Sequence, residues 1–423
     1  MRIPRIAAAL LTTVGLAAAV VGCADNSLQV AVDSQHEYLD GRGPITFVQG
    51  KDNSGVLPPL VARWNTTHPG EQVTIKEQTD QADQQHQDLV QHFQARDTGY
   101  DVVTVDVVWT AEFAARGWLQ QLAGSMGVDT SGLIPATVHG ASYGGQLWAM
   151  PTTSDGGMLF YRKDLVSAPP TTWSEMMSDC SIAHEHHIGC YAGQFAQYEG
   201  LTVNAAEAIN SAGGSIVADD GVTPTVDSPK AKAGLAALAA AFADGNIPRA
   251  ALTFQEEQSR QAFQTGQALF MRNWPYVYSL MSAEGSEVAG KFGIAPLPGH
   301  DGIGNSSLGG HNAAINVFSQ HKATARDFLE FLASDEQQRS FLEVGSLAPV
   351  RASLYHDPAL QSEFPYLETL LTSIQNAVPR PVSPYYPAIT RAVQSNVYSL
   401  LQGTKDVDTA AHDISASIGA AQS

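Results

Sequence analysis

The strongest hydrophobic pattern in the chain lies at residues 101–118, in the stretch DVVTVDVVWTAEFAARGW. Its β-branched residues follow one another almost without a break, as they do in a parallel strand that is covered on both faces. Thr110 is expected to cap a helix over 111–116. Because ligands bind at the carboxyl ends of strands in open parallel sheets, Asp106 and Trp109 are candidate ligand contacts. The alternative is that Asp106 only turns the chain and that Trp109 belongs to the core.

Short strands and amphipathic helices alternate before this stretch. The expected elements are, in order, a strand at 44–48, a helix at 56–68, a strand at 73–77, a polar run over 78–87 and a helix at 89–95. This order predicts an α/β fold with a parallel, doubly wound sheet. The loops after the first two strands should then lie at the same edge as Asp106. They contribute four more candidates: Asp52, Asn53, Gln78 and Asp80.

Later segments supply candidates of the same kind. Asp155 lies in a flexible turn before a strand at 158–161, and such a stretch suits a crossover between two lobes. Trp274 and Tyr276 follow a strand at 268–272. A glycine-rich loop and a rigid, aromatic tail segment add two polar candidates: Asn312 and Arg380.

The start of the chain has the pattern of a secretory signal peptide. Two arginines precede an apolar run that is too short to span a membrane and ends in small residues, so residues 1–22 are expected to be removed. A cysteine directly after a small residue resembles the bacterial lipobox, VVGC, which implies lipidation of Cys23 and an anchored protein. Residues 23–43 are then a polar tether. The alternative is ordinary secretion with a chance cysteine at this position.

Composition narrows the classes of partner. The mature part, about 400 residues, is long enough for two domains with sizeable cores. The chain carries a net charge of −19, and loss of the two signal arginines gives −19 − 2 = −21. Such a charge argues against nucleic acid and against an anionic membrane surface as partners. No second apolar stretch is long enough to span a membrane.

The two remaining cysteines, Cys180 and Cys190, form an even pair in an exported chain, which predicts one disulfide rather than two free thiols. Between them lies the sequence His184-Glu185-His186-His187, which has the composition of a metal-ligand cluster. We expect a solvated loop there and no metal site.

Several segments together resemble those of extracytoplasmic solute-binding proteins of ABC importers, in the sugar-binding cluster, and most of all its trehalose/maltose-binding branch. The segments are VVGC, YDVVTVDVVWTAEFAARGWLQ, TSDGGMLFYRKDLV, MRNWPY, LGGHNAAI, LAPVR and RPVSPYY. Each is weak alone, but their order and spacing are specific, and the match covers nearly all of the mature chain.

The resemblance implies a two-lobe α/β periplasmic-binding-protein fold, maltose-binding-protein-like, with a hinge and an interlobe ligand cleft. One lobe would comprise residues 44–152 and 313–351, and the other 153–312 and 352–423. Ligand would bind between the lobes, which close over it.

The family's binding positions fall on several of the candidates. Asp106 and Asp155 resemble the family's binding carboxylates. Trp274 and Tyr276 resemble its aromatic platform, and Arg380 resembles the arginine of its tail segment. Gly310 resembles the family's glycine whose backbone approaches the sugar. The family's acid in the first loop corresponds to Asp52, or Asn53 has the role of that acid here. His311 departs from the pattern, because close relatives carry a tryptophan there, and this leaves the identity of the disaccharide open.

These residue types suit a neutral sugar. A buried hydroxyl without a partner costs about 1–3 kcal/mol, so a dry site needs carboxylates, amides and an arginine to satisfy each one. Aromatic faces cover the apolar patches of the rings. Some of the aromatic and charged residues could instead serve the fold alone: Trp274 could be core, Arg380 could pair with an acid of its own lobe, and Tyr385, Tyr386, Trp64 and Trp118 could serve packing.

The resulting prediction is a non-catalytic, monomeric binder without a cofactor. It would capture a di- or oligosaccharide, of the trehalose/maltose type, and deliver it to the permease subunits of an ABC importer at the outer face of the bacterial membrane. Two alternatives belong to other classes. One is a glycosidase, since paired carboxylates in a sugar cleft can also cleave. The other is a metal-capturing lipoprotein, which would require His184, His186 and His187 to lie in the cleft.

Overall fold

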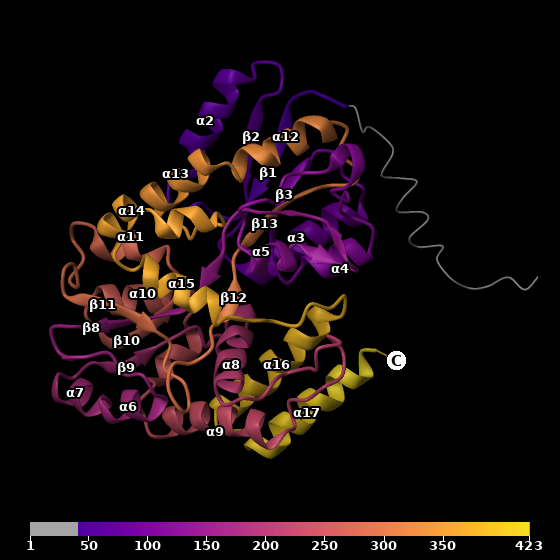
Figure 1. Cartoon of the computed structure of the whole chain (residues 1–423). Helices are drawn as coiled ribbons and strands as arrows, with labels where there is room; N and C mark the ends of the chain where they lie inside the picture. Colours follow the sequence, from indigo (N-terminus) through magenta and orange to yellow (C-terminus); the bar gives the residue numbers. More distant parts are fainter. Residues whose placement is uncertain (1–40, 423) are drawn as a thin grey trace, which may run out of the picture.

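The computed structural model describes residues 41–422. The elements form two groups around separate sheets, with the strand β12 between them (Figure 1). The expected signal peptide, the lipidation site Cys23 and nearly all of the tether lie outside the described residues. Among residues 41–422, no helix has the length and apolar character needed to cross a bilayer.

The first sheet has five strands in the order β2-β1-β3-β13-β6. Its strands are β1 (Ile45–Gln49), β2 (Val73–Glu77), β3 (Val102–Asp106), β6 (Met150–Pro151) and β13 (His311–Ile315). The first three run parallel, which confirms the predicted parallel arrangement for them, whereas β13 runs antiparallel to β3 and to β6. The chain returns from the second group of elements as β13, which lies between β3 and β6. The sheet as a whole is therefore mixed.

Several helices pack on this sheet, and the first of them buries one apolar face. In α2 (Leu57–Thr67) the buried residues are Leu57, Leu60, Val61 and Trp64, so Trp64 is core as expected. The other helices of this group are α3 (Ala82–Gln94), α4 (Thr110–Ala115), α5 (Pro135–Gly140), α12 (Lys322–Leu332) and α13 (Asp335–Gly345), with the 3-10 turn η1 (Gly124–Met126). A short hairpin is formed by β4 (Ser142–Tyr143) and β5 (Gln146–Leu147).

The second sheet has four strands in the order β11-β8-β10-β9. They are β8 (Met158–Arg162), β9 (Gly189–Ala192), β10 (Ala268–Asn273) and β11 (Phe292–Pro296). All six residues of β10 are buried. Around the sheet lie α6 (Trp173–Ser178), α7 (Cys180–Glu185), α8 (Glu199–Ser211), α9 (Pro229–Ala243), η2 (Arg249–Thr253), α10 (Glu256–Gln264), α11 (Val277–Ser282), η3 (Ala352–His356), α14 (Pro358–Glu363), α15 (Leu367–Gln375), α16 (Tyr386–Leu401) and α17 (Val407–Ala420).

A small third sheet gathers three segments that are distant in sequence. It has the order β14-β12-β7, with β7 (Asp155–Gly156), β12 (Ser307–Gly309) and β14 (Val378–Pro379). Gly309 pairs with Asp155, and Leu308 pairs with Pro379, the residue before Arg380. This sheet therefore brings the crossover turn, the glycine-rich loop and the tail segment to one place.

Three local predictions were wrong. The polar run after β2 is mostly helix, because α3 already begins at Ala82 and exposes its polar face while Leu89 and Phe93 are buried. Thr110 is the first residue of α4 and does not cap it. The segment between the cysteines is a helix, α7, followed by β9, rather than a loop; the predicted disulfide between Cys180 and Cys190 is confirmed.

Candidate functional site

A cleft with a cavity volume of about 300 Å³ lies between the two main sheets. Residues from both groups of elements line it, including the loops after β1 and β2, the ends of β3 and β10, and the first turns of α8 and α10. The acidic and basic lining residues, histidine included, are Lys51, Asp52, Asp80, Asp106, Asp155, Glu199, Glu256, Glu257, His311 and Arg380. Ligand pockets usually measure about 300–1,000 Å³, so this cleft can hold a small organic molecule.

Asp106 is the last residue of β3, at the carboxyl edge where it was predicted. Its Oδ1 accepts a hydrogen bond from the Val108 amide at 3.1 Å and one from Arg380 Nη2 at 2.9 Å. Asp106 thus turns the chain and also pairs across the cleft. Its Oδ2 has no hydrogen-bond partner among residues 41–422, which leaves this oxygen for a guest.

Arg380 joins the two sides of the cleft. Its guanidinium is buried, pairs with Asp106 and also donates through Nη1 to Glu199 at the start of α8. Glu199 accepts further bonds from the Tyr386 and Thr390 hydroxyls, and burial raises its pKa against the opposing effect of Arg380. The alternative that Arg380 pairs with an acid of its own side is therefore correct in part, and Tyr386 is a packing residue with its hydroxyl on Glu199.

Asp155 presents a carboxylate without any hydrogen-bond or ion-pair partner in the described part of the chain. Loss of hydration raises the pKa of this carboxyl to about 7, with a further rise from the Asp106 charge and a smaller opposing effect from Arg272. Such a group can accept from a hydroxyl when ionised and donate to one when protonated. Its position at the cleft comes from β7, which pairs with β12.

The aromatic candidates lie on both sides of the cleft. Trp109 is 5% exposed, packs against His86 and Phe113 in the core, and also lines the cleft. Trp274 and Tyr276 line it from the segment after β10. The Tyr276 hydroxyl donates to Glu257 at 2.7 Å, which fixes the ring.

The first two loops bring only part of the predicted set to the cleft. Asp52, Asn53 and Asp80 line it. The Asp52 carboxylate is largely occupied by its own loop, because it accepts from the amides of Ser54, Gly55 and Leu57 and thereby holds the start of α2.

Two candidates do not reach the cleft, and the prediction is withdrawn for them. The Gln78 side chain donates to Asp88 at 2.6 Å. Asn312 is fully buried and donates to Thr110 and to the Gly140 carbonyl. Gln78 follows the end of β2 and Asn312 is the second residue of β13, and neither lines the cleft.

Gly310 and His311 stand at the return into β13. Gly310 has φ +112°, and a Cβ there would lie 2.2 Å from the Thr153 carbonyl oxygen, so only glycine fits this approach. Burial lowers the pKa of His311, and the neutral imidazole lines the cleft where a tryptophan was expected in relatives.

The lining residues that the sequence reasoning missed include a polar group at two helix starts: Tyr198, Glu199, Glu256 and Glu257. They stand at the starts of α8 and α10, and the polar cluster QEEQ at 255–258 was the available signal for the second helix. Burial raises the pKa of Glu256. Arg380 Nε is buried without a hydrogen-bond partner among the described residues, and the buried Tyr198 hydroxyl interacts with the Glu256 carboxylate without forming a hydrogen bond of ordinary geometry. A guest with several hydroxyls could satisfy both.

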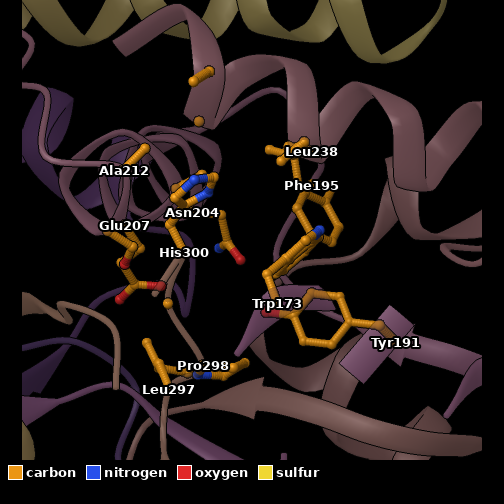
Figure 2. Close-up of a pocket in the computed structure, with 16 residues that line it drawn as sticks. Trp173, Tyr191, Phe195, Asn204, Glu207, Ala212, Leu238, Leu297, Pro298 and His300 are labelled. Carbon is orange, nitrogen blue, oxygen red and sulfur yellow. The ribbon is translucent and has the colours of Figure 1, made fainter. Parts of the chain in front are cut away.

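A second, smaller cavity of about 70 Å³ lies between α8 and α9, away from the cleft. Trp173, Tyr191 and Phe195 form its apolar side, and Asn204 and Glu207 its polar side (Figure 2). The histidine cluster lines neither cavity. Its residues lie on and after α7, and nowhere in residues 41–422 do three metal-ligating side chains meet as an ion would require. The condition that the metal-capturing alternative requires, that these histidines lie in the cleft, is not met.

Comparison with known proteins gives consistent matches. A family model described as "bacterial extracellular solute-binding protein" matches residues 50–339. A "probable ABC transporter-binding protein" of Deinococcus radiodurans is 35% identical over 328 residues, which cover 74% of this chain and 77% of that protein. The "maltotriose-binding protein" of Pyrococcus abyssi is 24% identical over 309 residues, or 71% of this chain and 65% of its own length.

Solved structures agree with these matches. The maltose-bound MalE3 of T. maritima superposes with a TM-score of 0.84 at 32% identity, covering 89% of this chain and 98% of that one. The two-lobe, maltose-binding-protein-like fold expected from the sequence is confirmed.

Proposed function

This chain belongs to the bacterial extracellular solute-binding proteins, and from that premise we propose that it captures a disaccharide or short oligosaccharide, of the trehalose/maltose α-glucoside type, for uptake by an ABC importer. Closure of the two lobes would bury the sugar, and the permease subunits of the importer would receive it. The maltose and maltotriose named for its relatives support this class of ligand.

The observation that carries the proposal is the meeting of Asp106, Asp155 and Trp274 on one cavity. Asp106 ends a strand of the first sheet, Asp155 begins a strand of the small third sheet, and Trp274 follows a strand of the second sheet, so the tertiary fold brings them together. Carboxylates that accept from hydroxyls and an indole that covers C–H surface are what an uncharged sugar needs.

A thermal-shift screen of the soluble domain tests the proposal. The panel is trehalose, maltose, maltotriose, sucrose and xylo-oligosaccharides. For one site, ligand at about a hundred times its dissociation constant raises the free energy of unfolding by about 2.7 kcal/mol, which gives a clear rise in the melting temperature. No shift with any α-glucoside would contradict the proposed ligand class.

One observation favours a second candidate, a glycosidase. Asp155 has a raised pKa beside the carboxylate of Asp106, and acid–base pairs in glycosidases use such a difference. Against it, Asp106 is held by Arg380 and by the Val108 amide. Prolonged incubation with maltose or trehalose, assayed for free glucose, separates the two functions, because a binder releases none.

We further propose that Cys23 anchors the protein to the outer face of the cell membrane and that the protein acts as a monomer. Mass spectrometry of the N-terminal peptide from cells tests the anchor, since lipidated Cys23 carries a large, defined mass increment. Light scattering of the soluble domain tests the monomer. The lobe limits at 44–152 with 313–351, and 153–312 with 352–423, stay part of the proposal.

A further inference from the structure

A buried ion pair lies directly behind Trp274. Arg272 is in β10, is 0% exposed, and donates through Nε and Nη2 to the two carboxylate oxygens of Glu207, at 2.9 and 2.6 Å. A third donor, Nη1, reaches Gln194 at 3.2 Å. Glu207 also accepts from the Ser307 amide. The guanidinium is therefore fixed on every side that faces the core.

The remaining face of the guanidinium lies against the indole of Trp274, with its central carbon 3.7 Å from the ring centroid. Gly309 lies against the benzo edge of the same ring, since a Cβ on this glycine would meet Trp274 Cζ3 at 2.8 Å and Cη2 at 2.9 Å. One face and one edge of the indole are thus held, and Trp274 lines the cleft.

A second glycine makes room for the pair itself. A Cβ on Gly157 would lie 2.6 Å from Arg272 Nη2 and 2.9 Å from Glu207 Oε1. The close approach of the ion pair therefore explains why position 157 of the crossover segment is a glycine, just as the close approach of the indole explains Gly309.

Stability alone does not explain such a pair. Replacement of a buried ion pair by apolar residues of similar volume is often neutral or stabilising, whereas removal of one partner is costly. What the planar, bidentate guanidinium supplies is a fixed orientation, because it stacks on an aromatic face while both ends are held.

We propose that Arg272, held by Glu207, is a positioning residue that sets the ring plane of Trp274 for stacking against the saccharide in the cleft. This inference rests on the proposed function for its binding readout. The indole itself touches the ligand, and Arg272 acts only through it.

The test uses the double variant R272M/E207L, which removes both charges together and leaves no unpaired buried charge. Glu207 also borders the second cavity, so a changed side chain there has space (Figure 2). We expect the variant to fold with a melting temperature near that of the wild type, to lose the part of the near-UV circular dichroism that Trp274→Phe also removes, and to bind maltose and trehalose at least tenfold more weakly by calorimetry.

Two further variants keep the test informative if the double variant fails to fold. G309A leaves the ion pair intact but pushes on the ring, so it should change the same near-UV signal and weaken binding. Its Cβ would also lie 3.2 Å from Asp155 Cβ, so the near-UV signal is the deciding readout for this variant. R272K keeps the positive charge but lacks the planar guanidinium. It should give a smaller loss of affinity than R272M/E207L, of about threefold or more. R162M serves as the matched control, because Arg162 is on the neighbouring strand β8 and pairs with Asp164 away from the cleft.

Unchanged near-UV signal and unchanged affinity in folded R272M/E207L, or in G309A, would overturn the proposal. If the wild type binds no sugar of the panel, the proposed function fails, while the near-UV comparison still decides whether Arg272 positions Trp274. The two failures are therefore distinguishable.

Discussion

Arg380 Nη2 lies 2.9 Å from Asp106 Oδ1, although 274 positions separate the two residues in the sequence. The contact joins the end of β3 to the segment after β14, and the same guanidinium also binds Glu199 at the start of α8. A second contact also joins the two sides of the cleft: the Glu199 amide donates a hydrogen bond to Asp83 of α3 at 3.3 Å. The structure is therefore one in which the two sides of the cleft already touch.

Substitution of Asp106 tests its role in the cleft. In Asp106→Ala the free Oδ2, the bond to Arg380 and the bond from the Val108 amide are lost. Arg380 keeps Glu199 as its partner, so the fold should persist. We expect sugar affinity to fall at least tenfold, about 1.4 kcal/mol, by calorimetry. Gln78→Ala is the matched control at the same sheet edge, because Gln78 bonds Asp88 outside the cleft. Equal affinity in both variants would remove Asp106 from the site.

Asp155 should make stability depend on pH. Its pKa of about 7 in the folded protein lies above the ordinary value of 3.8, so the folded state keeps a proton that the unfolded state has lost between about pH 4 and pH 7. The free energy of unfolding should therefore fall as pH rises through this window, by up to about 4 kcal/mol, with the loss complete above pH 7.

Asp155→Asn removes this dependence, because the amide does not titrate. Thermal unfolding at pH 5, 6, 7 and 8 should show a smaller decline for the variant than for the wild type, so that the variant gains relative stability at pH 8. Parallel curves for the two proteins would contradict a raised pKa at Asp155.

The disulfide should stabilise the protein without serving the cleft. Cys180 and Cys190 close a short loop and line neither the cleft nor the second cavity. The variant C180S/C190S should lose about 2–3 kcal/mol of unfolding free energy in a urea titration and keep its sugar affinity. A tenfold loss of affinity would instead indicate that the disulfide shapes the cleft.

Gly310 should tolerate no side chain because a Cβ would collide with the backbone, and Gly302 separates this effect from that of a positive φ. Gly302 also has a positive φ, +138°, but nothing lies within 4 Å of a Cβ there, whereas a Cβ on Gly310 would collide with the Thr153 carbonyl. Gly310→Ala should therefore lower the unfolding free energy by at least about 2 kcal/mol more than Gly302→Ala. Similar losses in the two variants would show that backbone strain alone limits position 310.

The sequence by itself predicted most of the elements and most of the candidate residues that line the cleft. The valine run before Asp106 predicted a covered strand, and Asp106 ends that strand. The order of strands and helices determined the parallel part of the first sheet, and the even cysteine pair determined the disulfide. Local periodicity and composition carry this information because each element buries its own apolar face.

The tertiary structure alone decided which side chains share the cleft. Gln78 and Asn312 have the right residue types at strand ends, yet their side chains bond elsewhere. Glu199 and Glu256 belong to helix starts, and no local pattern says which way a helix start points. Likewise, the pairing of Arg272 with Glu207 behind Trp274 joins residues 65 positions apart, and such long-range contacts leave no periodic trace in a single sequence.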